Sequence, residues 1–363
     1  MGRYILRRLL LIVPTLLGML LITFIVAQFA PGGPIEQIIA RATMGEMSTT
    51  AGISGASDAG MTSQAMEQAA SGQNPATYGL DPELIADLER QFGFDKPVHV
   101  RFFTMVWNYL QFDFGESYFQ DRPVVELVIE RIPVSLSLGG WSLLIIWSVS
   151  IPLGVAKAVR DGAPFDFWTS TVIFVGYAIP GFILAILLIV VFAGGNYFDV
   201  FPLRGLVSEN WHELSFFGKL GDYLWHMVLP VAALTVGGFA TLTMLTKNSF
   251  LEEISKQFVL TARAKGLTER RVLYGHVFRN AMLIVIASFP SAFVGILFFG
   301  NLLIEVIFSL DGMGLLSYEA LIKRDFPILF GTLFVFGLIG LVMHLIGDLT
   351  YVLVDPRIDF ETR

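Results

Sequence analysis

The stretch that decides the fold is TLTMLTKNSFLEEISKQFVLTARAKGLTERRVLYGHVFRNAMLIVIASF, residues 241–289. It begins inside one apolar run, crosses a charged segment from Lys247 to Asn280, and enters a second apolar run at Ala281. A helix needs about 20 apolar residues to cross the hydrocarbon core of a bilayer, because each residue adds about 1.5 Å to a path of roughly 30 Å. The stretch therefore predicts two membrane-spanning helices joined by a polar loop.

Apolar runs of this length recur along the whole chain. Hydrophobic residues make up 54% of the sequence, charged residues make up 15%, and the mean hydropathy is +0.66, whereas about a quarter of a soluble domain is charged. We predict an all-α, polytopic membrane protein with six transmembrane helices and a periplasmic insertion between helices 1 and 2. The predicted spans are Leu9–Ala30, Pro133–Val155, Thr169–Ala193, His226–Thr246, Ala281–Ile304 and Ile328–Val354.

The basic residues predict the orientation of these spans, because cytoplasmic loops carry an excess of Lys and Arg. With a cytoplasmic N-terminus, 14 of the 24 basic residues fall on the cytoplasmic side: Arg3, Arg7, Arg8, Lys157, Arg160, Lys247, Lys256, Arg263, Lys265, Arg270, Arg271, Arg279, Arg357 and Arg363. Six spans return the chain to its starting side. We therefore predict that both termini are cytoplasmic.

The sequence divides into four regions. Residues 1–30 hold the N-terminus and the first span, which at about 22 residues exceeds the roughly 7–15 apolar residues of a signal peptide, so we expect it to be retained. Residues 31–132 form the periplasmic segment, in which 44–79 is rich in Ser, Gly, Ala and Thr and is expected to be flexible. Residues 133–354 form a five-helix core with the cytoplasmic loop 247–280, and residues 355–363 form a cytoplasmic tail.

The cytoplasmic loop predicts a helix, a bend and a second helix. Phe250, Ile254 and Phe258 recur at helical spacing and continue to Thr261 with Ala262, so they form one apolar stripe. Gly266 suits a left-handed residue at the end of the first helix. Thr268 can then cap a second helix over Glu269–Arg279. We call residues 257–277 the elbow, and its small, polar corner predicts a peg that enters a cleft in a partner.

At this loop the chain resembles the permease subunits of binding-protein-dependent ABC importers. Their loop carries Glu-Ala-Ala, three residues and Gly, which dock the ATPase; the matching residues here are Leu260, Thr261, Ala262, Arg263, Ala264, Lys265 and Gly266. Of that pattern, Ala262 and Gly266 match literally. The run 261–266, followed by Arg279-Asn280-Ala281, is similar to the form found in dipeptide and oligopeptide permeases, although Leu283-Ile284 replaces their usual Leu-Pro.

The resemblance covers nearly the whole chain and is strongest to the YejB-type branch of oligopeptide permeases. It includes Arg7-Arg8-Leu9, 30–34, 112–117, Ile304-Glu305, Gly312-Met313-Gly314-Leu315, 197–210, Tyr351 and Asp355-Pro356-Arg357. One departure is Asp311, where many members have Pro before the Gly-x-Gly.

The resemblance implies a multi-pass protein of the bacterial inner membrane that forms half of a peptide path. Its implied partners are a second permease subunit, favoured to be a different chain, two ATPase subunits and a periplasmic peptide-binding protein, besides the lipid bilayer. ATP and Mg would bind the partner ATPase, and this chain itself is expected to bind no cofactor, metal or nucleic acid and to hold no catalytic residue. Peptide length and preference are expected to lie largely in the binding protein.

Three ionisable residues in or beside the spans are candidates for the path or its gate, because burying a charge in a membrane is costly. His344 and Asp348 lie four apart on one helical face, so they either pair, line a polar passage, or place Asp348 at the hydrated cytoplasmic boundary. Glu305 ends the fifth span on the outer side, where it either closes the external gate or packs against Lys323 and Arg324.

Two other classes of function, an ion-coupled transporter or channel and a membrane enzyme, would require sequence features different from those of a transport subunit driven by a partner. The sequence has no Gly-x4-Gly-Lys-Ser/Thr phosphate loop, so the chain is not itself the ATPase. An ion-coupled secondary transporter or channel would be expected to show paired carboxylates or broken helices in matching halves. A membrane enzyme would need a catalytic set, but the chain has no Cys, no Gly-x-Ser-x-Gly and no His-Glu-x-x-His.

Overall fold

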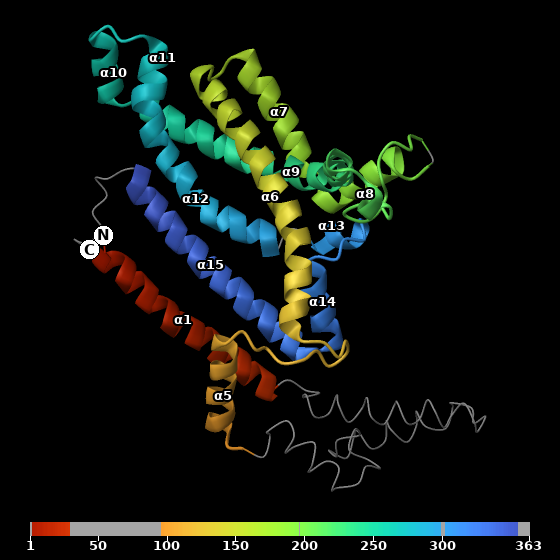
Figure 1. The fold of residues 1–363 in the computed structure, drawn as a ribbon. Coiled ribbons are helices and arrows are strands. Elements are labelled where there is room, and N and C mark those ends of the chain that lie inside the picture. The colour runs from red at the N-terminus through yellow and green to blue at the C-terminus, as the bar shows by residue number, and fades with distance from the viewer. Residues whose placement is uncertain (1, 30–95, 196, 299–301, 355–363) are drawn as a thin grey trace, which may run out of the picture. The chain divides into compact units, whose positions relative to one another are not determined.

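The structure is a computed structural model and describes residues 2–29, 96–195, 197–298 and 302–354. The expected flexible stretch 44–79 and the tail 355–363 lie outside the described residues, which are mostly helical (Figure 1). The elements are α1 Gly2–Phe29, α5 Val98–Leu110, α6 Val124–Val159, α7 Pro164–Ala178, α8 Gly181–Phe192, η2 Trp211–Glu213, α9 Phe216–Ile254, α10 Gln257–Ala264, α11 Glu269–Val272, η3 Leu273–Val277, α12 Phe278–Phe298, α13 Leu302–Ile307, α14 Met313–Lys323 and α15 Phe326–Val354.

Among the described residues, five helices are long and apolar enough to cross a membrane, and a bent pair of helices makes a sixth candidate. The five are Leu6–Val26, Val124–Val159, Phe216–Ile254, Glu269–Gly295 and Phe326–Thr350, and the pair is Pro164–Ala178 with Gly181–Phe192. This pattern matches the predicted order of six spans. The helical, polytopic prediction is thereby confirmed.

The third predicted span is not one straight helix. α7 and α8 meet at an angle of 91°, and Pro180 lies at the break. Ile179, which precedes this proline, has the extended backbone angles φ −88° and ψ 115°, because the proline ring disfavours helical angles in the residue before it. The predicted span Thr169–Ala193 therefore corresponds to a bent pair of helices rather than to one straight helix.

Other spans also differ from their predicted bounds, and α6 begins at Val124 rather than at Pro133. α9 begins at Phe216, where the Ser215 hydroxyl accepts a hydrogen bond from the Gly218 amide and caps the helix, so it is longer than the predicted span from His226. α12 ends at Phe298, and Ile304 belongs to the separate helix α13.

The chain forms two compact units. Unit 1 comprises Met1–Val13, Glu126–Lys323 and Thr332–Arg363, and unit 2 comprises Pro14–Val125 and Arg324–Gly331. In unit 2, the Asp325 carboxylate accepts hydrogen bonds from Ser117 Oγ at 2.5 Å and the Tyr118 amide at 3.3 Å. Burial and the nearby Asp325 charge both raise the pKa of the Tyr118 phenol. The segment 112–117, which carries part of the family resemblance, is thus fixed by buried hydrogen bonds.

In unit 1, three helices approach one another closely at glycines. A Cβ added to Gly154 of α6 would lie 2.6 Å from Thr246 Cβ of α9, one added to Gly238 would lie 2.4 Å from Ile146 Cδ1, and one added to Gly176 of α7 would lie 2.8 Å from Val236 Cγ1. Such small residues permit close packing of helices in a membrane. These three glycines are therefore close-packing positions between α6, α7 and α9.

We expect Gly154→Ala to lower the stability of the folded protein, because the new methyl group meets both a side chain and the Thr243 carbonyl of α9. Overpacking of this kind costs about 1–3 kcal/mol. Gly140→Ala, on the same helix, is the control, because nothing lies within 4 Å of its added Cβ. Thermal unfolding of the detergent-solubilised protein should show a lower midpoint for Gly154→Ala alone, and equal midpoints would contradict this packing.

Candidate functional site

The elbow forms a compact helical corner at one end of unit 1, where α10 and α11 stand together (Figure 1). α9 ends at Ile254, and Lys256 adopts the extended angles φ −74° and ψ 151° before α10 begins. The predicted stripe is therefore interrupted and does not lie on one continuous helix. Phe250 and Ala262 are buried as expected, but Val259 replaces Thr261 as the buried residue between them.

Gly266 forms the corner. Its φ is +76°, so the predicted left-handed conformation is confirmed, and a residue with a Cβ is strained in this region. Thr268 occupies the predicted start of the next helix, but its side chain makes no capping hydrogen bond. The second helix is also longer than predicted, because α11 continues through the π-helical turn η3 into α12.

The two arms of the elbow are joined by an ion pair and an apolar core. Arg263 of α10 donates two hydrogen bonds to the Glu269 carboxylate of α11, at 2.9 and 3.0 Å. Beneath them, Val259, Val272 and Val277 are buried in one apolar cluster that also contains residues of α6, α9 and α12. The elbow is therefore packed against the ends of the spans.

The outer face of the elbow combines exposed apolar and basic side chains. Leu260 is 59% exposed and Tyr274 is 57% exposed, and Lys265, Arg270 and His276 are exposed beside them. Of the seven residues predicted for ATPase coupling, Ala262 is buried and the other six are exposed. These six are therefore placed where a partner can reach them.

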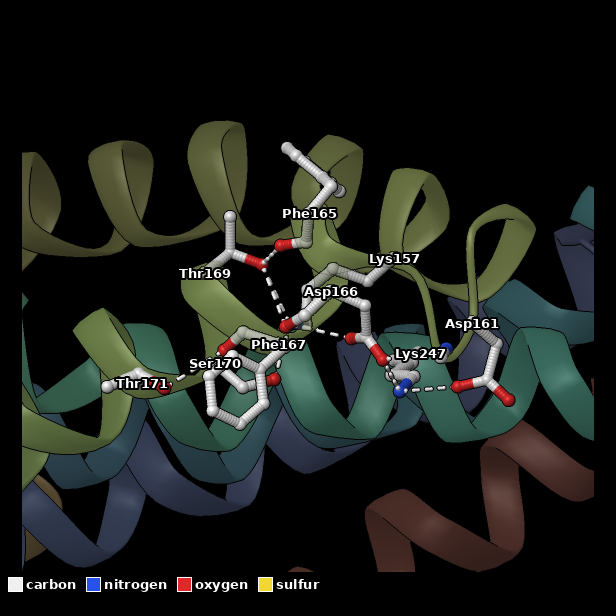
Figure 2. A network of polar contacts seen from close by, with 10 residues as sticks. Lys157, Asp161, Phe165, Asp166, Phe167, Thr169, Ser170, Thr171 and Lys247 are labelled. Atoms are coloured by element: carbon white, nitrogen blue, oxygen red, sulfur yellow. Dashed lines mark hydrogen bonds and ion pairs between the residues drawn. The ribbon is translucent and has the colours of Figure 1, made fainter.

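Sequence reasoning missed a cluster of four charged residues between the ends of α6, α7 and α9, shown in Figure 2. We call Lys157, Asp161, Asp166 and Lys247 the charge cluster. The Asp166 carboxylate lies between two ammonium groups, with Oδ1 2.9 Å from Lys157 Nζ and Oδ2 2.7 Å from Lys247 Nζ. Lys247 Nζ also lies 2.7 Å from Asp161 Oδ1. Lys247 is thus held by two carboxylates at the end of its span.

Lys157 is the most buried member of the charge cluster, with 0% of its surface exposed. Its ammonium group donates to the Asp166 carbonyl at 2.8 Å, to Thr169 Oγ1 at 2.9 Å and to Ser170 Oγ at 2.6 Å. Every donor of the buried ammonium group thus has an acceptor. The pattern Lys157, Asp161 and Asp166 around the turn after α6 was the available signal in the sequence.

Glu305 is fully buried in α13 and holds the start of α14. Its carboxylate accepts hydrogen bonds from the Leu315 amide at 2.7 Å and from Ser135 Oγ of α6 at 3.2 Å. Lys323 pairs with Glu319 instead, so the expected packing of Glu305 against Lys323 is wrong.

The Gly-x-Gly after α13 lets the Glu305 carboxylate approach the backbone closely. A Cβ at Gly312 would lie 2.2 Å from Glu305 Oε1, and one at Gly314 would lie 3.1 Å from Oε2. The preceding Asp311, which departs from the family pattern, forms an ion pair with Arg131 of α6 at 2.5 Å. The whole motif therefore closes onto α6.

His344 and Asp348 do not pair with each other. Asp348 Oδ2 lies 2.9 Å from Arg8 Nη2 of α1, whereas His344 is exposed. An arginine carries a permanent charge and a planar set of donors that matches a carboxylate, which favours it as the partner. Glu305 and Asp348 are thus held in separate ion or hydrogen-bond networks, and a role of either in the path stays a prediction.

Comparisons with known proteins agree with the resemblance seen in the sequence. Residues 150–360 match the family described as the binding-protein-dependent transport system inner membrane component. The chain is 58% identical over 363 residues to the peptidoglycan transport system permease protein YejB of Agrobacterium fabrum, covering 100% of both chains. It is 54% identical over 367 residues to the inner membrane ABC transporter permease protein YejB of Escherichia coli O157:H7, again with 100% of both covered. It is 31% identical over 369 residues to the oligopeptide transport system permease protein AppB of Bacillus subtilis, covering 99% of this chain and 100% of that one.

Replacing Glu305 with alanine should destabilise the part of unit 1 around α13 and α14. The Leu315 amide and the Ser135 hydroxyl would lose their acceptor in a buried place, at a cost of about 1–3 kcal/mol for each unsatisfied group. Glu319→Ala is the control, because Glu319 is exposed and pairs within α14 alone. Unfolding in detergent should begin at a clearly lower temperature for Glu305→Ala than for Glu319→Ala, and the reverse order would refute the assigned role.

Proposed function

Since the chain belongs to the family of binding-protein-dependent transport system inner membrane components, and is thus a membrane-spanning permease subunit, we propose that it forms half of a path for peptides. The family membership carries this proposal, and the Bacillus subtilis relative, which is named as a permease of an oligopeptide transport system, supports it. The 58% identical relative is named for peptidoglycan transport. We therefore include peptide-bearing cell-wall fragments in the proposed substrate class.

The proposed partners are two ATPase subunits, a second permease chain and a periplasmic peptide-binding protein. The lack of a phosphate-binding loop in this sequence supports separate ATPase subunits. Two chemically different substrates among the relatives, peptidoglycan and oligopeptides, suit a system in which a separate binding protein selects the cargo.

A cavity of about 320 Å³ supports a path through the helical core. It lies among α6, α9 and α12, and its walls include Trp147, Gly238, Thr241 and Ser288. Each of these residues falls inside a predicted span rather than at its end. We propose that the path runs along this side of the three helices.

The ion-coupled alternative is not favoured. The described residues contain one broken span, α7 with α8, whereas that mechanism is associated with broken helices in both of two related halves. The candidate carboxylates Glu305 and Asp348 are also engaged by protein partners rather than paired with each other. Family membership and this geometry both favour a transport subunit driven by partner ATPases.

We propose that the elbow docks the ATPase through its exposed face. Leu260→Asp should release the ATPase subunits, because it places a charge on the most exposed apolar residue of α10. Gln257→Asp changes the charge of the same exposed helix by the same amount and serves as the control. Affinity purification of the complex from the native host should lose the ATPase with Leu260→Asp and retain it with Gln257→Asp.

If both variants retain the ATPase as the wild type does, the docking role is overturned, whereas the membership of the family is unaffected. Loss with both would show that charge on α10, rather than the apolar contact of Leu260, controls assembly.

The cytoplasmic location of the elbow and of both termini is also a proposal, supported by the distribution of basic residues. The chain has no cysteine, so a single introduced thiol reports its side of the membrane. Lys265→Cys, on the elbow, should react with a membrane-impermeant maleimide in inside-out vesicles alone. Phe216→Cys, at the opposite end of α9, should react in right-side-out vesicles alone. The opposite labelling pattern would invert the proposed topology.

A further inference from the structure

The charge cluster joins three helices at the point where the elbow begins. Lys157 lies in α6, Asp166 in the first turn of α7 and Lys247 in α9, while Asp161 lies in the turn between α6 and α7 (Figure 2). The cluster contains two positive and two negative side chains, so its formal charges balance. Asp166 contacts both lysines and is the member that connects all three helices.

A cluster of this kind fixes geometry more than it adds stability. Burying ions costs several kcal/mol each, and apolar residues of similar volume often support a fold equally well. The hydrogen bonds that Lys157 donates to Thr169 and Ser170 set the position of α7 relative to α6. The amide of Gly162 also donates to Asp166 Oδ2 at 3.2 Å, which fixes the intervening turn.

The same part of α9 is packed into the elbow. Phe250 lies about one turn beyond Lys247 and is fully buried in the cluster of apolar residues that contains Val259 and Ala262 of α10. Ala158, next to Lys157, belongs to this cluster as well. A displacement of the elbow therefore acts directly on the segment of α9 that carries Lys247.

On its other side, the charge cluster leads to the broken span. α7 runs from Pro164 to Ala178, approaches α9 closely at Gly176, and then turns by 91° into α8. α8 lacks any ionic tie of its own among the described residues, because all its residues are apolar. Whatever position α7 takes at its start is passed along the helix to this bend.

We propose that Asp166 is a positioning residue for transport, which fixes α7 to α6 and α9 so that movement of the elbow reaches the bent pair α7–α8. The inference rests on the proposed docking of the ATPase at the elbow. In this mechanism the ATPase moves the elbow, and the charge cluster makes the three helical ends move as one body. Loss of the central carboxylate separates ATP hydrolysis from the movement of α7.

The test uses the purified complex in proteoliposomes, with ATP hydrolysis and uptake of a labelled peptide measured in the same vesicles. Asp166→Asn keeps the size of the side chain and removes its charge. We expect ATP hydrolysis to change by less than about twofold while the uptake per ATP falls by about tenfold, a size typical of coupling between sites. Glu319→Gln is the control, because it removes the charge of a carboxylate that pairs with Lys323 within α14, outside the charge cluster. It should change the uptake per ATP by less than about twofold.

A disulfide between α7 and α9 tests whether holding α7 in place restores the uptake per ATP. In the Asp166→Asn background, Gly176→Cys with Val236→Cys introduces the sole thiols of the chain. A Cβ at 176 lies 2.8 Å from Val236 Cγ1, so the two sulfurs are within bonding reach. Oxidation should tie α7 to α9 again and restore the uptake per ATP, and reduction should remove the effect. A substitution that merely weakened the fold would lower ATP hydrolysis and uptake together, and oxidation would then raise both, so the uptake per ATP distinguishes positioning from stability.

Two results would overturn the proposal: an unchanged uptake per ATP in Asp166→Asn, or a parallel loss of hydrolysis and uptake in an assembled complex that oxidation does not restore. If Asp166→Asn does not assemble, Ser170→Ala removes one 2.6 Å hydrogen bond of Lys157 and should lower the uptake per ATP by a smaller factor. An unchanged ratio in that variant also refutes the role of the charge cluster.

Failure of the peptide proposal is recognised separately. If the wild-type complex hydrolyses ATP but imports no peptide, the proposed substrate class is wrong. The role of the charge cluster is then tested with a spin label attached at Leu187→Cys, on the exposed face of α8. Its mobility should change on ATP binding in the wild-type background and stay constant with Asp166→Asn. Equal changes in both backgrounds would rule out transmission through Asp166.

Discussion

A charged side chain that leaves water must find opposite charge or hydrogen-bond partners, because its lost hydration costs several kcal/mol. This constraint organises the end of unit 1 that carries the elbow. The fully buried Lys157 is compatible with the fold because Asp166, Thr169 and Ser170 surround its ammonium group. Asp166 in turn requires Lys247 nearby, so the positions of α6, α7 and α9 at this end are set together.

The same constraint explains the contact between α13 and α14 in unit 1. The buried Glu305 carboxylate takes hydrogen bonds from Ser135 and from the first turn of α14. A carboxylate at a helix N-terminus interacts favourably with the unpaired amides there. Gly312 and Gly314 are needed because side chains at these positions would occupy the space of the carboxylate. The Gly312-Met313-Gly314 turn thus packs around the buried carboxylate of Glu305.

Between these two polar sites, the helices approach through glycines and bend at a proline. Gly154, Gly176 and Gly238 let α6, α7 and α9 pack closely, while Pro180 divides the third span. The subunit therefore combines a tightly packed set of helices with one marked discontinuity. The proposed movement of the bent pair α7–α8 during transport uses both features.

The sequence by itself determined the membrane class, the order of the spans and the left-handed corner at Gly266. Each of these depends on local properties: the length of an apolar run, the spacing of its polar ends, or the freedom of a single glycine. The loop motif and the resemblance along the chain also identified the family before the fold was known. These features need no knowledge of which segments meet in space.

Only the tertiary structure decided the partners of the buried charges and the shape of the third span. Lys247 and Asp166 are far apart in the sequence, so nothing local distinguishes a paired lysine from one that reaches the membrane surface. Asp348 likewise turned to Arg8 rather than to its helical neighbour His344. A proline such as Pro180 permits a bend in a helix, but the 91° angle between α7 and α8 depends on how α8 packs on α9. Ion pairs and helix angles are set by long-range packing, and packing is a property of the assembled helices rather than of any one segment.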